Sequence, residues 1–130
     1  MSYPIEIILH RQLADCLAIP VFIVDPDGNL LFYNEPAELV LGRRYEDTGE
    51  MSVEEWSTAF RTTYESGAHM PPENLPLVRT LNDHLPHHAT FRIESMNGRQ
   101  QSIAVTSIPI IGRTGVFEGA VAIFWKTTDQ

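Results

Sequence analysis

The stretch Asp25-Pro26-Asp27-Gly28-Asn29 decides the fold, because it is a tight-turn signal between two short apolar segments. Asp-Gly supplies the positive φ angle that the tip of a tight hairpin needs, so residues 20–24 and 29–33 are expected to pair antiparallel. A second signal of this kind, Met96-Asn97-Gly98-Arg99, lies between apolar-rich stretches near the other end of the chain. We therefore predict an antiparallel sheet in two parts, with a helical middle between them.

A helix is predicted ahead of the first hairpin, over residues 4–17, because apolar residues recur there at the spacing of one helix face. Pro20 lies beyond its end, where the chain can become extended. The apolar side carries Ile5, Ile8, Leu9, Leu13, Cys16 and Leu17. On that side we interpret Cys16 as a small buried hydrophobic residue. Residues 1–18 are assigned to this N-terminal helix and residues 19–128 to the domain that follows.

Short helices are predicted between the two hairpins from their start signals. Asn34, with a proline in the first turn after it, can cap a helix that runs to Leu41 and ends at Gly42. The stretch Ser52-Val53-Glu54-Glu55 has the form of a capping box. Asn74-Leu75-Pro76-Leu77 repeats the Asn-and-Pro arrangement, so its asparagine is expected to cap another helix.

Apolar and polar residues alternate near the C-terminal end, which predicts strands over residues 88–94, 101–110 and 116–125. The second of these changes phase between Val105 and Ile108, so a bulge or twist is expected near Thr106 or Pro109. The last strand is apolar on both faces, with Phe117, Val121, Ile123 and Trp125 on one face and Ala120, Ala122 and Phe124 on the other. Since a solvated face normally carries polar residues, the N-terminal helix, a second copy of the chain or both must cover the second face.

The composition limits the classes of protein. At 130 residues the chain is long enough for one domain with one core. Its formal charge of −8 and its single lysine, Lys126, argue against nucleic-acid binding, because phosphate contacts need clustered basic residues. One cysteine cannot form an internal disulfide, and no stretch has the pattern of a signal peptide or a membrane span. We therefore expect a cytoplasmic location, and we interpret the chain as a segment of a longer polypeptide.

The order of helix, two strands, short helices and three strands resembles the PAS domain family of bacterial signalling proteins, over about residues 12–128. The matching stretches are Ile23-Val24-Asp25-Pro26-Asp27-Gly28, Phe32-Tyr33-Asn34-Glu35-Pro36-Ala37, Pro72-Glu73-Asn74-Leu75-Pro76-Leu77-Val78-Arg79-Thr80-Leu81, Asn97-Gly98, Ser107-Ile108-Pro109-Ile110 and Phe117-Glu118-Gly119-Ala120-Val121. The third stretch is similar to one in the subgroup common in multi-sensor histidine kinases and cyclic-dinucleotide enzymes. The order and spacing of the stretches carry the resemblance.

The resemblance implies an α+β fold with a five-stranded antiparallel sheet in the order 2-1-5-4-3, short helices on one face and the amphipathic helix at the N-terminus. It also implies a ligand cavity between the inner face of the sheet and the helices, lined by Tyr64, Leu77, Leu81, Phe91, Ile93, Ile103, Val105 and Ile123. An ordinary filled core requires the same residue spacing and is the alternative interpretation. A polar group would enter the cavity only if Arg79, Arg92 or Thr106 turned inward.

Cofactors are weighed on particular residues. A histidine in this part of a PAS domain can ligate heme, but a histidine such as His84 near a helix C-terminus is also stabilised by the helix dipole, and we favour the second interpretation. His84, His87 and His88 share no helical face that would hold zinc. The Asn-Cys-Arg motif of the family's flavin photosensors is missing, which argues against a flavin.

We interpret the chain as a non-catalytic sensory module of signal transduction that binds a small ligand, forms a dimer, or both, to regulate a linked effector domain. The homodimer is expected to involve the N-terminal helix and the outer face of the sheet. Lys126 stands where many family members have an aspartate that links the domain to the effector helix. No nucleophile elbow, phosphate loop or metal motif of an enzyme is found in the sequence. The alternatives are a dimerisation domain with a filled core and a small α+β enzyme.

Overall fold

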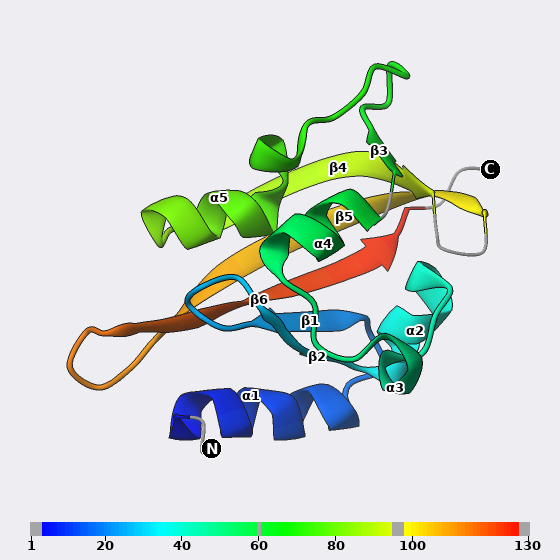
Figure 1. Cartoon of the computed structure of the whole chain (residues 1–130). Coiled ribbons are helices and arrows are strands. Elements are labelled where there is room, and N and C mark those ends of the chain that lie inside the picture. Colours follow the sequence, from blue (N-terminus) through cyan, green and yellow to red (C-terminus); the bar gives the residue numbers. More distant parts are fainter. Residues whose placement is uncertain (1–3, 60, 95–97, 128–130) are drawn as a thin grey trace.

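The computed structural model describes residues 4–59, 61–94 and 98–127 and shows a curved antiparallel sheet with helices on both faces (Figure 1). The six strands lie in the order β2-β1-β6-β5-β4-β3. Their bounds are β1 (Val21–Val24), β2 (Leu30–Tyr33), β3 (Arg61–Thr63), β4 (His87–Glu94), β5 (Gln100–Ile111) and β6 (Phe117–Lys126). The predicted five-strand order is present as β2-β1-β6-β5-β4. The expectation of five strands is wrong, because the sheet has β3 as a sixth strand at its edge. This strand has only three residues, and its Arg-Thr-Thr sequence lacks the apolar alternation that would indicate a strand.

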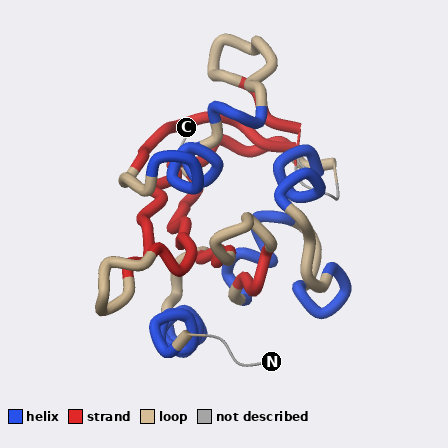
Figure 2. Tube along the Cα trace, turned by 60° about the vertical axis from the view of Figure 1, so that its left-hand side comes forward, coloured by secondary structure: helices blue, strands red, loops and turns tan. Residues whose placement is uncertain are grey.

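The helices divide between the two faces of the sheet. On the outer face lies α1 (Ile5–Cys16), and its buried side chains join those of β1, β2, β5 and β6 in one apolar cluster. The inner face is covered by the chain between β2 and β4, as the end-on view in Figure 2 shows. The helices of this part are α2 (Glu35–Leu41), α3 (Tyr45–Thr48), α4 (Val53–Ala59), the 3₁₀ turn η1 (Pro72–Asn74) and α5 (Pro76–Asp83). The concave inner face therefore holds the larger core.

The first hairpin forms at the predicted turn. Gly28 adopts a φ of 91°, and its N–H donates to the Asp25 carbonyl at 2.9 Å. The Asp25 side chain accepts hydrogen bonds from the backbone N–H groups of Asp27 and Asn29, both at 2.9 Å. Asp25 is thus the turn residue that its position before Pro-Asp-Gly predicts.

The second hairpin is confirmed by the pairing of β4 with β5, which runs from His87 opposite Ser107 to Glu94 opposite Gln100. Gly98 has a φ of 85°, as a hairpin tip requires. The predicted turn residue Asn97 lies outside the described residues. Strand β6 joins the two hairpins, because it pairs with β1 on one side and with β5 on the other, so all strands belong to a single sheet.

The helix-start signals are confirmed for α2 and α4 but not for α5. Asn34 accepts a hydrogen bond from the Ala37 N–H, and Gly42 ends α2 in the left-handed conformation. In the capping box of α4, the Ser52 N–H donates to Glu55 at 2.9 Å, and the Glu55 N–H donates to the Ser52 hydroxyl at 3.3 Å. The expectation for Asn74 is wrong, because α5 begins at Pro76 after an uncapped Leu75.

Strand β6 presents different residues to its two faces, and a bulge changes the phase at its start. Ala122 and Phe124 face the inner core, whereas Val121 belongs to the outer cluster beneath α1. Phe117 was expected on the same face as Val121, but it packs against the inner core because the β5–β6 register shifts beside it. The shift lies between Ile110 and Ile111, directly after Pro109, where the sequence predicted a bulge or twist near Thr106 or Pro109.

Helix α1 covers the outer face of the sheet, but it packs with an unexpected side. Ile7 and Ala14 are its buried residues, at 3% and 1% exposure. The predicted apolar side points largely to solvent, with Ile5 at 57%, Ile8 at 38%, Leu9 at 55% and Leu13 at 56% exposure. Cys16 is exposed as well, so its interpretation as a buried residue is wrong. The side of α1 that carries Ile7 and the small Ala14 packs against β1, β2, β5 and β6 instead.

Candidate functional site

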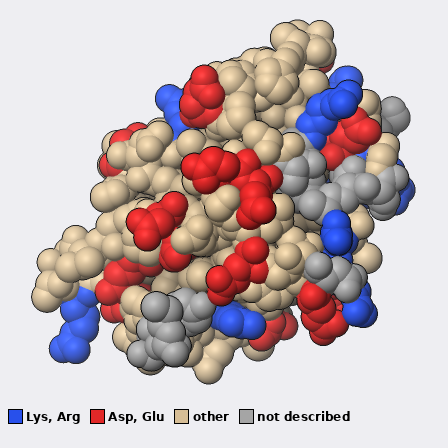
Figure 3. Space-filling model, viewed as in Figure 1, with Lys and Arg blue, Asp and Glu red and all other residues tan. Residues whose placement is uncertain are grey.

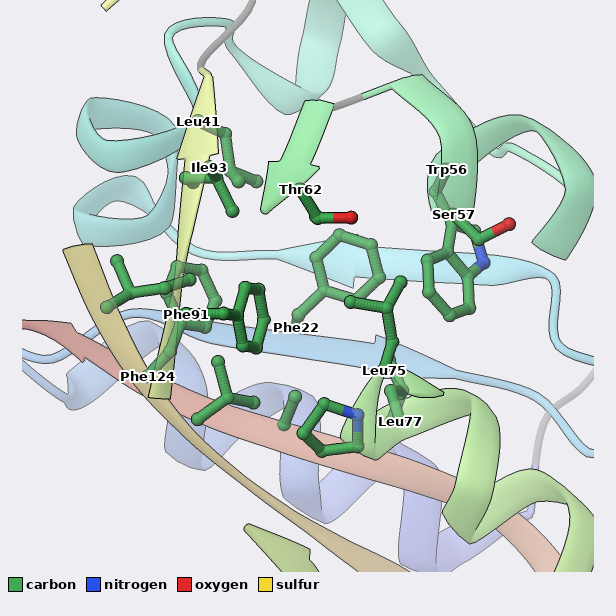
Figure 4. A pocket seen from close by; sticks show the side chains of 14 residues that line it. Phe22, Leu41, Trp56, Ser57, Thr62, Leu75, Leu77, Phe91, Ile93 and Phe124 are labelled. Atoms are coloured by element: carbon green, nitrogen blue, oxygen red, sulfur yellow. The ribbon is translucent and has the colours of Figure 1, made fainter. Parts of the chain in front are cut away.

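An apolar cavity lies in the core between the concave face of the sheet and the helices that cover it (Figure 4). Its volume is about 90 Å³. The residues that line it come from β1, α2, α4, β3, the start of α5 and the last three strands. They are Phe22, Leu41, Trp56, Ser57, Thr62, Leu75, Pro76, Leu77, Phe91, Ile93, Ile103, Val105, Ala122 and Phe124.

The sequence identified part of this lining. The predicted residues that line the cavity are Leu77, Phe91, Ile93, Ile103 and Val105. Tyr64 and Leu81 pack against the same core without lining the cavity. The expectation for Ile123 is wrong, because its side chain packs in the outer cluster beneath α1. The residues of β6 that face the cavity are instead Ala122 and Phe124.

Several lining residues were missed by the sequence reasoning. Phe22 lies in β1, where residues are buried on both faces, so alternation does not indicate which side chain points inward. Trp56 comes from α4, and its indole Nε1 donates to the Gly28 carbonyl at 2.6 Å. The apolar side of α4 that starts at its capping box was the available signal for Trp56.

The cavity offers few polar groups. Thr62 lines it, but the Thr62 hydroxyl donates to the Met70 carbonyl at 2.9 Å. Ser57 is the other hydroxyl residue in the lining. The three residues considered as polar donors lie elsewhere, since Arg79 and Arg92 are exposed and Thr106 contacts His88 at 2.9 Å. No residue that lines the cavity has a titratable side chain, so its chemistry suits an apolar molecule and not an acid-base reaction.

The size of the cavity limits what fits without rearrangement. A dry engineered cavity of about 150 Å³ holds benzene, and drug-sized ligands occupy roughly 300–1,000 Å³. The cavity here is smaller than either, at about 90 Å³. Any ligand larger than a few heavy atoms therefore has to displace α4 or α5 from the sheet.

The histidines near the end of α5 lie outside the cavity and have separate partners. The His84 ring stacks on Phe117 with centroids 3.8 Å apart. His87 Nε2 lies 2.7 Å from the Asp83 carboxylate. Desolvation raises the pKa of Asp83, but hydrogen bonds from the Leu85 N–H and from His87 outweigh it, and the net pKa is lowered. Within the described ranges, no three His, Cys, Asp or Glu side chains gather as metal ligands would.

The charges on the surface disfavour polyanionic partners. Acidic side chains are spread over the face shown in Figure 3, in keeping with a formal net charge of −8. Arg44 and Glu46 form an exposed ion pair at 2.9 Å, so one of the few basic groups is already compensated. Among the described residues, none of the helices has both the length and the apolar character needed to cross a bilayer.

Comparisons with known proteins agree with this geometry. The model of the PAS domain family matches residues 8–75, more than half of the chain. A search of curated proteins finds no match.

Solved structures share the fold at low sequence identity. The PAS domain of BvgS from Bordetella pertussis is 15% identical with a TM-score of 0.58, over 96% of this chain and 88% of that one. The Rhodobacter sphaeroides LOV protein is 12% identical with a TM-score of 0.73, over 96% and 69% of the two chains. The light-state dimer of the fungal blue-light photoreceptor Vivid is 11% identical with a TM-score of 0.63, over 83% and 77%. The matched family model and the cavity beneath a curved sheet lead to one conclusion: this chain belongs to the PAS domain family.

Proposed function

We propose that this domain is a non-catalytic sensory module in which a small apolar ligand in the core cavity and the pairing of two copies through α1 together regulate a linked effector domain. The observation that carries the proposal is the unfilled apolar cavity under α4 and α5. A fully packed core would leave dimerisation as the remaining role. A cavity with no titratable lining supports binding over catalysis.

The contacts of the covering helices support a response to ligand binding. Trp56 of α4 is held to the first hairpin by its hydrogen bond to the Gly28 carbonyl. Helix α5 is held to β5 by a buried hydrogen bond of 2.6 Å between the Thr80 and Ser107 hydroxyls. A ligand acts only through its different affinity for two arrangements of the protein. A molecule that displaces Trp56 or Leu77 would favour the arrangement in which these contacts are altered.

The route to an effector would use both ends of the domain. Helix α1 is joined to α2 through the Asn34 side chain, which contacts the Ala14 carbonyl. Strand β6 ends at Lys126, which is exposed and lies opposite Ile103 in the sheet. Many family members have an aspartate at this position. Here Lys126 would instead present a positive charge to an effector helix that follows β6.

Native mass spectrometry of the freshly purified chain tests the ligand part of the proposal, because it reports bound molecules and subunit number together. Benzene, which has to push a covering helix slightly away from the sheet to enter, is a suitable added probe, with Trp56 fluorescence as the signal in a Trp125→Phe background. The Ala122→Leu variant fills the cavity from β6 and should abolish the benzene response. An Ala68→Leu variant changes an exposed loop residue and should respond like the unchanged protein. Equal benzene responses in all variants would exclude the cavity as the site.

The uncovered side of α1 supports a dimer. Its exposed apolar residues fit most of a heptad, with Leu9 and Cys16 at position a and Ile5 at position d, while the polar Gln12 occupies the second position d. In the same heptad Ile7 and Ala14 occupy position f, directly opposite the seam, and they are the residues buried on the sheet. The helix thus binds its own sheet with one side and presents a second apolar side to a partner.

The flanking positions favour a parallel pair of helices. In a parallel pair, residue g of one helix meets residue e of the next heptad in the other helix. This brings Ile8 of one copy against Leu13 of the other, so both exposed apolar residues are covered. In an antiparallel pair, position g of one helix meets position g of the other. Ile8 would then face Asp15, which also occupies position g. The self-complementary pattern therefore supports a second copy as the occupant.

Cys16 reports the orientation of the pair directly, because it is the only cysteine in the chain and is exposed. In a parallel pair the two Cys16 residues face each other at position a, and mild oxidation should join the copies rapidly. A matched control moves the thiol away from α1 in a Cys16→Ser, Ser66→Cys variant, which should cross-link only slowly. Equal cross-linking rates, or a monomer in sedimentation at high concentration, would refute the paired helices.

A further inference from the structure

Two carboxyl groups from distant parts of the chain meet where α1 contacts the β5–β6 hairpin. Glu6 lies in the first turn of α1, and Glu118 is the residue passed over by the register shift at the start of β6. Their carboxyl groups lie close enough to interact directly. An ionised carboxylate can only accept hydrogen bonds, so a hydrogen bond between the two groups forms only when one of them carries a proton.

The surroundings of Glu118 disfavour its ionised form. Among the described residues, its Oε1 is the one buried side-chain oxygen or nitrogen that has no hydrogen-bond partner. Its carboxyl group also packs closely over the chain, since a Cβ added at Gly112 would lie 2.5 Å from Glu118 Oε2. A buried, unpaired oxygen is costly when it belongs to a charged carboxylate and less costly in a neutral acid.

The neighbouring charges favour ionisation of Glu6 instead. The hydrogen bond with Glu118 is the largest cause that lowers the pKa of Glu6, followed by a backbone hydrogen bond, and the positive charges of Arg113 and His10 add to them. The hydrogen bond with Glu6 likewise raises the pKa of Glu118, with burial and the charge of Glu6 as further causes. The proton therefore resides on Glu118, and Glu6 accepts from it.

This contact lies beside an apolar contact between α1 and β6. The Ile7 side chain sits on β6 so tightly that a Cβ added at Gly119 would be 3.2 Å from Ile7 Cδ1. Glu6 and Ile7 are adjacent, so the carboxyl pair and the apolar contact hold the same turn of the helix. Figure 1 shows the N-terminal end of α1 beneath the β5–β6 hairpin.

We propose that a proton shared between Glu118 and Glu6 fastens the first turn of α1 to β6, and that loss of this proton loosens the turn. After deprotonation the hydrogen bond is replaced by repulsion between two carboxylates. Arg113, in the β5–β6 turn, and His10, one turn further along α1, are the positive groups that face the pair, and both act on Glu6. The device makes the placement of α1 on the sheet depend on pH, whatever ligand or partner the domain binds.

The direction of the pH effect follows from the two pKa shifts. The raised pKa of Glu118 stabilises the folded state below the ordinary glutamate value, and this contribution is lost as pH rises through the raised value. The lowered pKa of Glu6 stabilises the folded state above the ordinary value, and this contribution is lost as pH falls through the lowered value. The contact is therefore strongest between the two pKa values, where the pair holds one proton.

Hydrogen exchange of the α1 amides in the full chain, corrected for the intrinsic rate at each pH, tests the proposal. Protection of the first turn should fall by up to about tenfold for each pH unit between the ordinary glutamate pKa and the raised pKa of Glu118, and it should level off above the raised value. The Glu118→Gln variant carries an amide that donates to Glu6 at every pH, so its protection should not change over the same range. The Glu54→Gln variant removes an exposed acid from α4 and should behave like the unchanged protein.

A titration of the Glu118 carboxyl carbon by NMR gives a measurement that needs no variant. Its midpoint should lie above the ordinary glutamate pKa. A Glu118 midpoint at the ordinary glutamate pKa, or the same pH dependence of α1 protection in the Glu118→Gln variant as in the unchanged protein, would overturn the proposal.

Discussion

The side-chain amide of Asn34 donates a hydrogen bond of 2.9 Å to the Ala14 carbonyl, so the residue that caps α2 also holds the C-terminal end of α1. Asn34 is only 2% exposed, and its amide makes a further bond to the Ile19 carbonyl. Its side-chain oxygen accepts from the N–H groups of Val21 and Ala37. One buried side chain thus joins α1, the start of β1 and α2.

Replacement of Asn34 should destabilise the domain and loosen α1. We expect Asn34→Ala to lower the free energy of unfolding by about 2–4 kcal/mol, since it removes a helix cap and leaves buried backbone groups without partners. Urea denaturation measures this change. The Asn82→Ala variant, at an exposed site of α5, should change the value by less than about 0.5 kcal/mol. A change of similar size in both variants would contradict the assigned role of Asn34.

A side chain at Gly28 should be more damaging than one at Gly67. Both glycines have a positive φ, at 91° and 97°, so alanine at either site introduces similar backbone strain of about 1 kcal/mol. A Cβ at Gly28 would also lie 2.9 Å from the Val53 Cβ, whereas nothing lies within 4 Å at Gly67. Thermal unfolding of Gly28→Ala and Gly67→Ala should therefore differ by about 1–3 kcal/mol. Equal losses of stability in the two variants would show that α4 shifts away from the methyl group added at Gly28 without destabilising the domain.

Shortening Leu77 should enlarge the cavity and improve binding of an apolar probe. We expect Leu77→Ala to cost about 2–5 kcal/mol of stability and to raise the affinity for benzene, because the added space stays apolar. Chemical denaturation and fluorescence titration give the two quantities. The Leu85→Ala variant, at a residue 57% exposed, should alter neither by much. Loss of stability without any gain in benzene affinity would show that the core collapses into the space.

A charge on the outward side of α1 should separate the copies and leave each copy folded. Leu9 is 55% exposed in the single chain, so Leu9→Glu should change monomer stability by less than about 1 kcal/mol while weakening the dimer at least tenfold. Analytical ultracentrifugation at several concentrations provides the test. Leu39→Glu, at a residue of α2 that is 77% exposed, is the control and should leave association unchanged. Equal association of the two variants would place the interface elsewhere.

The parts of the fold that the sequence predicted depend on short-range stereochemistry. The turn at Asp25–Gly28, the Asn34 cap and the capping box at Ser52 each satisfy backbone groups only a few residues away. The same signal failed at Asn74, because its side-chain amide donates instead to the Tyr64 hydroxyl at 2.6 Å. A partner ten residues away, brought close by the fold, competes there with the local cap.

The cavity lining was predicted where strand alternation indicates a single inward face. Phe91 and Ile93 of β4 alternate with exposed residues, and both line the cavity. Ile123 was misplaced because β6 is apolar on both faces, so hydrophobicity alone does not distinguish the side toward the cavity from the side toward α1. Trp56 was missed because its position depends on how α4 crosses the first hairpin.

From the sequence alone came the two hairpins, the chain order of five of the six strands and of helices α1, α2, α4 and α5, and the membership of most inward-facing residues in one core, since turns, caps and alternation act through neighbouring residues. Only the tertiary structure decided which side of α1 meets the sheet, where the β5–β6 bulge lies, and that Glu6 meets Glu118. The physical reason is that these features depend on close packing between segments far apart in the chain. Helix α1 packs on the sheet through Ile7 and the small Ala14, although its opposite side is more apolar. This packing brings the Glu6 carboxyl group next to that of Glu118.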